Sequence, residues 1–396
     1  MNLEEYVVIR SRHRIVPTLD NIRVRGAELM TDDPVQLEVE ETALTASDID
    51  DLRRDPSTRA IAPLMPMTLI QPVASEDDIS TDHRVPLTWG VEATAASQSP
   101  FDGSGVTVAV LDTGIDPDHP AFQGVDLVHR NFTSEGPDDT NGHGTHCAGT
   151  VFGRSIDGLR IGVAPGVQRA LIGKVLGEGG NSSGTIAQAM QWAVNEGAHV
   201  ISMSLGIDFP GFVQYLTEEA GLDVRPATSM ALEAYRANVN MFTELSSFIR
   251  AQGQFGQGCL VVAAAGNESR RPSYEIAVAP PAAGTGVVSV AALEERDGGF
   301  AVASFSNKQV DVAAPGVDVV SAIPGGGLGS KSGTSMATPH VAGIAALWAQ
   351  RQLDSHAAVD GARLMARVVA SGVTESLAAG TAIQDVGTGM VQAPLL

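Results

Sequence analysis

The chain has 396 residues and a formal net charge of −21, from 46 aspartates and glutamates against 25 lysines and arginines. An anionic membrane, DNA or RNA would repel such a charge, so we exclude these three as partners. Hydrophobic residues make up 43% of the sequence, but no apolar stretch reaches the length of a membrane span. The composition predicts a soluble α/β chain with one large domain and a small additional one.

The amino terminus, as written, carries no export signal. It contains an apolar run of only four residues. Charged residues lie on both sides of this run: Glu4, Glu5, Arg10, Arg12 and Arg14. Because no h-region is present, we expect a cytoplasmic location, or a secreted one if a preceding signal has been removed. Cys147 and Cys259 lie among small apolar residues, where reduced thiols pack as small hydrophobes, although a disulfide between them stays an alternative.

Residues 1–82 form the first expected domain, a small α+β unit. Alternating and apolar patterns predict strands at 6–10 and 36–40, a helix at 47–54 introduced by Thr45, and an extended segment at 58–67. The polar, acidic stretch at 75–83 predicts a linker. Residues 83–396 form the second, larger domain.

Val106 to Leu111 is a short, valine-rich run that stops at Asp112. The run predicts a buried parallel strand that delivers the Asp112 carboxylate to the carboxyl edge of a sheet, where catalytic groups of open α/β sheets gather. An aspartate in such a place also commonly makes a turn. The motif is therefore informative only together with others.

Two glycines flank His143 in Asn-Gly-His-Gly-Thr-His, residues 141–146. Small residues continue after it, so a helix that starts here can lie close to the sheet and present the imidazole from its first turn. His146 raises the question of a zinc site, but a zinc protease motif has an acid between its histidines, and Gly144 and Thr145 stand here. We expect no metal and a buried structural role for His146.

Ser335 lies in Gly-Thr-Ser-Met-Ala-Thr-Pro-His, residues 333–340, before an apolar stretch to Gln350 that predicts a buried helix. Backbone N–H groups at such a helix start can stabilise an oxyanion. A second buried strand is predicted at 260–265, and Gly266-Asn267 follows it. The four residues thus come from four predicted strand or helix ends.

A serine hydroxyl needs a base to take its proton and a third group to orient that base. With Asp112, His143 and Ser335 in this order, and within these motifs, the chain resembles the subtilisin-like serine proteases, the subtilases, from about Pro86 to Leu396. The resemblance implies a three-layer α/β fold with a mostly parallel central sheet, a triad of these three residues, a peptide or protein substrate and no cofactor.

The resemblance also assigns roles around the triad. In subtilases the asparagine of Ala-Ala-Gly-Asn donates its amide to the oxyanion, and Asn267 occupies that position. The two edges of the substrate cleft correspond to Ser204, Leu205 and Gly206 and, opposite them, Gly180, Asn181 and Ser182.

Between these motifs the sequence departs from the family pattern, because residues 207–258 form a far longer link than usual. Its start, Asp208 to Gly211, is loop-like, and residues 227–252 predict a helix. Many subtilases bind calcium in the loop after the catalytic histidine helix. Here that loop contains Arg154 and Arg160 and few oxygen ligands, so calcium is possible but the loop does not favour it.

Residues 1–82 resemble the subtilase prodomain, which templates folding and leaves its tail in the cleft as an intramolecular inhibitor. An unrelated docking domain is the alternative. We therefore expect the chain to be a self-processing endopeptidase that serves either general protein turnover or one dedicated substrate. A catalytically silent module for peptide binding or assembly is the second hypothesis.

Overall fold

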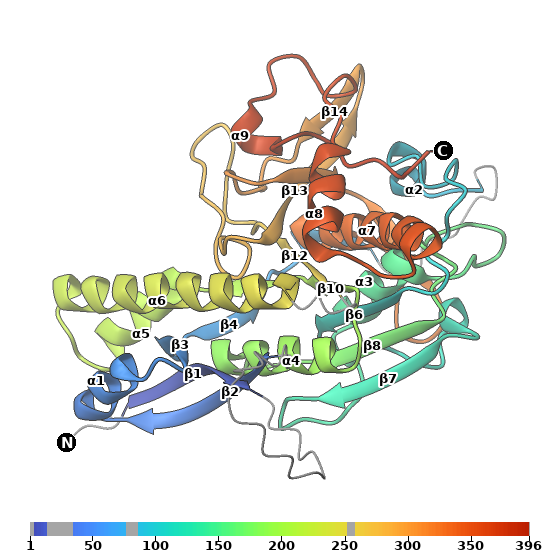
Figure 1. Cartoon of the computed structure of the whole chain (residues 1–396). Helices are drawn as coiled ribbons and strands as arrows, with labels where there is room; N and C mark the ends of the chain where they lie inside the picture. The colour runs from blue at the N-terminus through green and yellow to red at the C-terminus, as the bar shows by residue number, and fades with distance from the viewer. Residues whose placement is uncertain (1–3, 14–34, 77–85, 252–257, 396) are drawn as a thin grey trace, which may run out of the picture.

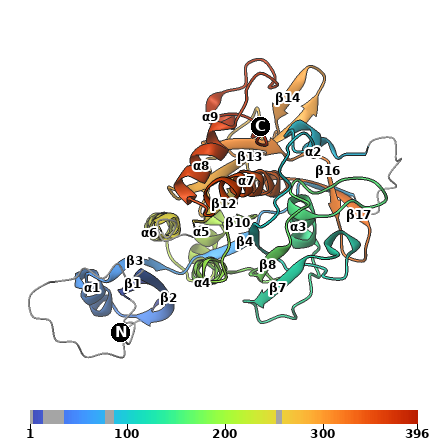
Figure 2. The same cartoon turned by 45° about the vertical axis from the view of Figure 1, so that its right-hand side comes forward.

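The computed structural model describes residues 4–13, 35–76, 86–251 and 258–395 (Figures 1 and 2). An eight-stranded sheet forms the centre of the larger domain, in the order β14-β13-β12-β10-β6-β8-β7 with β15 also paired to β13. Its neighbouring strands are parallel except β13 and β14. The strands are β6 (Thr107–Asp112), β7 (Asp126–Asn131), β8 (Arg169–Lys174), β10 (Val200–Met203), β12 (Leu260–Ala264), β13 (Val287–Arg296), β14 (Gly299–Val302) and β15 (Val312–Pro315).

Helices cover both faces of this sheet. Every residue of β6 is buried, and successive side chains enter opposite layers because a strand alternates between its two faces. Val108 and Val110 join the hydrophobic core that contains α3 (His143–Phe152) and α7 (Thr334–His356). Ala109 and Leu111 join the core that contains α4 (Ser183–Asn195) and α6 (Val224–Ala251). The predicted three-layer α/β architecture is confirmed.

Shorter elements complete the larger domain. They are α2 (Trp89–Ala93), a 3-10 helix (Pro120–Phe122), α5 (Phe209–Glu218), α8 (Gly361–Ala370), α9 (Ile383–Val386), β9 (Asn181–Ser182), β11 (Leu205–Ile207), β16 (Val319–Ala322) and β17 (Leu328–Ser332). Cys147 and Cys259 are both buried and unpaired, so the disulfide alternative is wrong. No helix in the described part of the chain is long and apolar enough to cross a membrane. The cytoplasmic location stays a prediction.

The amino-terminal unit forms the small α+β domain that its sequence predicts. Its sheet has the antiparallel order β2-β1-β3, from β1 (Glu4–His13), β2 (Val35–Leu44) and β3 (Thr58–Pro63). α1 (Ala46–Arg54) begins with a capping box, in which Thr45 and Asp48 satisfy each other's backbone N–H groups. β4 (Pro66–Leu69) and β5 (Ala74–Glu76) follow, and most of the expected linker at 75–83 lies outside the described residues.

This unit rests on the two helices α4 and α6 (Figure 2). β3 lies along α6, where Asn238 Nδ2 donates to the Pro63 carbonyl at 2.9 Å. β2 lies along α4, where the hydroxyls of Ser182 and Thr185 donate to the Glu41 carboxylate at 3.1 and 3.2 Å. Polar contacts at both helices therefore fix the position of the unit on the larger domain.

The long link 207–258 contains two helices, not one. Our expectation of a loop at 208–211 is wrong, because Asp208 caps α5 by accepting from the N–H of Gly211 and Pro210 fits the first turn. The helix predicted at 227–252 is confirmed as α6, with residues 252–257 outside the described residues. Met241, Phe242 and Leu245 of α6 pack into the core, so this half of the helix belongs to the outer layer.

Candidate active site

Three element ends bring the predicted triad residues to the carboxyl edge of the sheet. Asp112 ends β6, His143 opens α3, and Ser335 lies in the first turn of α7. α3 approaches β6 so closely that a Cβ on Gly144 would lie 2.1 Å from the Gly114 carbonyl oxygen. The expectation that small residues allow this helix to lie close to the sheet is confirmed.

Asp112 and His143 are joined by a buried hydrogen bond of 2.7 Å between Oδ1 and Nδ1. The N–H of Thr113 donates to the same carboxylate oxygen at 2.8 Å, which fixes the orientation of the carboxylate. His143 Nε2 is buried and has no hydrogen-bond partner among the described residues. The imidazole is therefore held by one nitrogen, and the other is free to accept a proton.

Opposing influences act on the pKa of His143. Burial is the largest single influence and lowers the pKa because it disfavours the charged ring, but Asp112 and, to a smaller extent, Cys147 act together against it and hold the pKa well above its usual value. A base with a raised pKa is neutral, and so able to take a proton, only at higher pH.

Ser335 does not engage His143 in this structure. Its hydroxyl donates to the carbonyl oxygen of Ile70 at 2.8 Å. Cys147 lies between the two motifs, with Sγ 3.7 Å from His143 Nδ1 and 3.4 Å from the Ser335 carbonyl oxygen. The structure thus brings all three triad residues to one place, with a segment of the amino-terminal unit against the serine.

Asn267 lies beside the serine, as the sequence predicts. Its Nδ2 donates to the Gln71 carbonyl at 2.8 Å, and its Oδ1 accepts from both the N–H and the hydroxyl of Thr334 at 2.9 Å. Thr334 therefore orients the amide so that its nitrogen faces the occupant of the cleft.

Both predicted edges of the cleft pair with β4. β11 pairs antiparallel with it through Leu205 and Leu69, and β9 pairs on the other side through Ser182 and Pro66. The Ser204 carbonyl accepts from the N–H of Ile70 at 3.4 Å. A Cβ on Gly180 would lie 2.7 Å from the Met67 carbonyl oxygen, so a side chain there would displace the strand. The six predicted residues all lie at or beside this three-stranded sheet.

A third edge was missed from the sequence. β17 pairs antiparallel with β5, and the Ser332 carbonyl accepts from the N–H of Val73 at 2.8 Å. Residues 66–76 thus cross the whole cleft in one uninterrupted chain, with Ile70 and Gln71 at the serine. The only local signal for this edge was its position just before Ser335.

A cavity of about 680 Å³ opens beside Asn267, and most of its lining is apolar. Phe209 and Pro210 of α5 and Leu232 and Tyr235 of α6 form part of the wall. The rings of Phe209 and Tyr235 meet edge to face with centroids 5.6 Å apart. Sequence reasoning predicted the helix that carries Leu232 and Tyr235 but did not identify these four residues as a pocket wall.

Asp139 is a further buried residue that sequence reasoning missed. Its carboxylate accepts from the Thr113 hydroxyl, from the N–H of Gly142, and from both the N–H and the hydroxyl of Thr145. It thereby ties the strand end that carries Asp112 to the helix that carries His143. We assign it a positioning role.

His146 is fully buried, and its Nε2 lies 2.9 Å from the Val319 carbonyl oxygen. Burial lowers the pKa of His146 to about 3, so the ring is neutral, as expected for a structural histidine. In the loop after α3, Arg154 donates to the carbonyls of Pro165 and Val167, and Arg160 to those of Gly162 and Val163. Guanidinium groups thus engage carbonyl oxygens around this loop, and the absence of calcium stays a prediction.

The chain is similar to one protein family and to several known proteins. The model of the subtilase family matches residues 103–380. M-protease of Shouchella clausii is 35% identical over 328 residues, which cover 79% of this chain and 71% of the relative. The thermostable alkaline protease of Halalkalibacterium halodurans is 32% identical over 349 residues, with 85% and 81% covered. Subtilisin Savinase of Lederbergia lenta is 37% identical over 283 residues, with 68% and 88% covered.

Proposed function

The chain belongs to the subtilase family and is a subtilisin-like serine endopeptidase, and on that premise we propose that Ser335, His143 and Asp112 carry its reaction. The hydrogen bond between Asp112 and His143 Nδ1, with Nε2 left free, is the observation that supports this assignment most.

In the proposed reaction Ser335 Oγ attacks the carbonyl carbon of the substrate while its proton passes to His143 Nε2. Asp112 stabilises the resulting imidazolium. The negative oxygen of the tetrahedral intermediate accepts hydrogen bonds from Asn267 Nδ2 and the backbone N–H of Ser335. Breakage of the C–N bond releases the amine, which takes the proton from Nε2, and water then hydrolyses the acyl enzyme by the same steps.

We further propose that the first intramolecular substrate is the amino-terminal segment and that the cut falls between Ile70 and Gln71. The Ile70 side chain lies over Gly206 at the cavity, because a Cβ added to Gly206 would be 3.5 Å from Ile70 Cδ1. Its N–H bonds to the Ser204 carbonyl and its own carbonyl accepts from Ser335. These contacts favour a cut upstream of the linker predicted at 75–83.

The same contacts support an inhibitory role for this segment before and after the cut. Asn267 donates to the carbonyl of Gln71, whereas Ser335 donates to the carbonyl of Ile70. The nucleophile and the oxyanion donor therefore engage neighbouring carbonyls, and the Ile70 carbonyl must turn toward Asn267 before attack. The contacts of β3 with α6 and of β2 with α4 lie upstream of the cut, so we expect them to hold the segment in place after cleavage.

Incubation of the full chain, with mass spectrometry of the products, tests the proposal. Wild-type protein is expected to yield a fragment that begins at Gln71, and Ser335→Ala to stay full length. A fluorophosphonate probe is expected to label wild-type protein at Ser335 and to react faster as the cut proceeds. A wild-type chain that stays intact and unlabelled would favour the silent binding module instead.

A further inference from the structure

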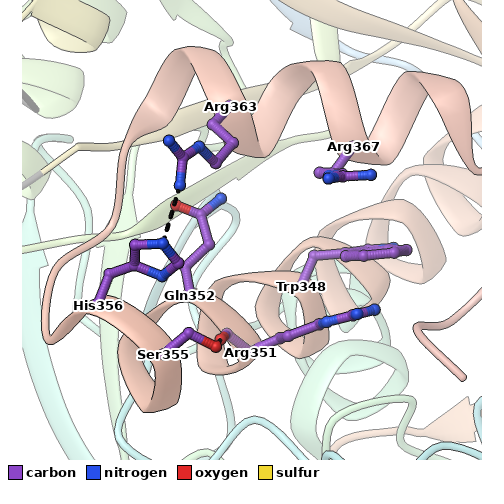
Figure 3. A pocket seen from close by; sticks show the side chains of 7 residues that line it. All are labelled: Trp348, Arg351, Gln352, Ser355, His356, Arg363 and Arg367. Atoms are coloured by element: carbon purple, nitrogen blue, oxygen red, sulfur yellow. Dashed lines mark hydrogen bonds between the residues drawn. The ribbon is translucent and has the colours of Figure 1, made fainter. Parts of the chain in front are cut away.

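A second pocket, of about 210 Å³, lies between α7 and α8, at the opposite end of α7 from Ser335 (Figure 3). Arg351 reaches it from α7, and Arg363 and Arg367 reach it from α8. Such a gathering is unusual in a chain that has 25 basic residues against 46 acidic ones. The pocket is therefore a local exception to the acidic character of the protein.

None of the three arginines forms an ion pair with a carboxylate in the part of the chain that the structure describes. Arg351 lies over the Trp348 ring, 5.3 Å from its centroid, and Arg363 Nη1 lies 3.2 Å from His356 Nε2. The nearby Asp360 carboxylate instead caps α8 by accepting from the N–H groups of Ala362 and Arg363. The guanidinium charges at this pocket thus lack a counter-charge.

Gln352 adds an independent observation that points to a ligand. Its side chain is 8% exposed, and it projects from α7 toward α8 between Arg363 and Trp348 (Figure 3). Oε1 accepts from the N–H of Asp360 at 2.9 Å, which fixes the amide. Nε2 is buried and has no hydrogen-bond partner among the described residues. A buried donor without an acceptor is rare in native proteins, and it marks a place for an acceptor.

The pocket thus offers three guanidinium groups and one fixed amide donor, but no free carboxylate. Its ligand must be an anion with several acceptor oxygens. A carboxylate has one charge and two oxygens in a plane, whereas donors that approach from two helices suit oxygens directed to several sides. We propose that this pocket binds a phosphate group, either inorganic phosphate or a phosphate monoester.

Binding would join α8 to the far end of the helix that carries Ser335, so its first expected effect is on stability. Ligand that binds only the folded state raises Tm with its concentration. Ser335→Ala protein, which avoids self-digestion, would be titrated with inorganic phosphate and with phenyl phosphate at constant ionic strength. Both Tm and the heat of binding would be measured, with sodium acetate as the carboxylate probe.

Tm and the heat of binding are expected to saturate with a phosphate compound and not with acetate. Arg363→Gln and Arg367→Gln are each expected to weaken binding by about tenfold or more, since a charge-assisted contact is lost. Arg225→Gln, an exposed arginine of α6 that removes the same charge, is the matched control and should bind as wild type. Gln352→Glu should abolish binding by adding a negative charge.

Three results would overturn the proposal. They are the absence of saturable binding by both phosphate compounds, equal binding by Arg363→Gln and Arg225→Gln, and acetate binding as tight as phosphate. Arg363→Lys provides a second variant if the glutamine variants fold poorly, because it keeps the charge and loses only the planar fork. It is expected to bind between wild type and Arg363→Gln, and wild-type affinity in a folded Arg363→Lys would also contradict the assignment.

Discussion

The hydroxyl of Ser335 donates a 2.8 Å hydrogen bond to the carbonyl oxygen of Ile70, a residue 265 positions upstream. The serine therefore contacts the chain that fills its own cleft, while His143 keeps Nε2 unpartnered within the described residues. Under our proposal, this is the enzyme with its first substrate bound but with the proton acceptor not yet engaged. The roles of the residues around Ser335 can therefore be tested by substitution.

Asn267→Ala is expected to lower kcat by about 10²–10³ with little change in KM, because its amide stabilises charge that exists only in the transition state. Thr334→Val should lower kcat by less, since it removes the hydroxyl that orients Asn267 Oδ1 and keeps the backbone N–H. Steady-state kinetics of the processed enzyme on a peptide ester or amide measures both. Wild-type kcat in Asn267→Ala would remove it from the oxyanion site.

The raised pKa of His143 predicts activity that increases toward alkaline pH. Neutral imidazole is the active form, so kcat rises as pH passes upward through this pKa. Asp112→Asn removes the main group that raises the pKa, and the acidic limb of the kcat profile should shift to lower pH while the maximal rate falls. A profile of kcat against pH for both proteins decides the point; an unshifted limb in Asp112→Asn would contradict the assigned cause.

The raised pKa of His143 also predicts the direction in which stability changes with pH. A group whose pKa is raised in the folded state contributes stability at low pH, and that contribution is lost as pH rises through the folded pKa. For Ser335→Ala protein, Tm should therefore fall with rising pH more steeply than in Ser335→Ala/Asp112→Asn. Thermal unfolding measured from below the ordinary pKa of histidine to above the raised pKa of His143 gives the dependence of Tm on pH for both proteins. Equal slopes would exclude the His143 contribution.

Mercurials are expected to inhibit through Cys147, whose sulfur lies between His143 and the Ser335 backbone. Burial raises the pKa of this thiol, so it stays protonated and is not the nucleophile. Cys147→Ala should stay active and become resistant. Cys259→Ala is the matched control, because Cys259 is also buried but its sulfur lies 3.8 Å from the Leu260 carbonyl oxygen, away from the triad; it should remain as sensitive as wild type. Loss of activity in folded Cys147→Ala would indicate a direct catalytic role.

Tyr235 closes the cavity beside Asn267 and lies edge to face with Phe209. Tyr235→Ala should enlarge the cavity and lower kcat/KM for substrates with a medium apolar residue before the cut by about 10-fold, relative to those with a large aromatic one. Arg225→Gln, also on α6, should leave the ratio unchanged. Profiling of a peptide library measures the preference, and an unchanged profile in Tyr235→Ala would place the specificity determinants elsewhere.

Sequence alone determined those features that depend on neighbours along the chain. The valine-rich run before Asp112 and the glycines beside His143 each specify an element and its end, so the sequence predicted a strand that ends at Asp112 and a helix that begins near His143. Thr45 likewise predicted the start of α1, because it is the N-cap residue of that helix. The helix start at Asp208 had the same kind of local signal, an N-cap followed by proline, and was misread as a loop.

The tertiary structure decided what depends on residues far apart in the sequence. The pairing of β4 with β9 and β11, and of β5 with β17, fixes which peptide bond meets Ser335, and no local pattern encodes that register. The cavity wall from Phe209 and Tyr235, and the gathering of Arg351 and Arg363, also arise only when separate helices pack together. Local sequence sets the ends of elements, whereas packing sets which ends and faces meet.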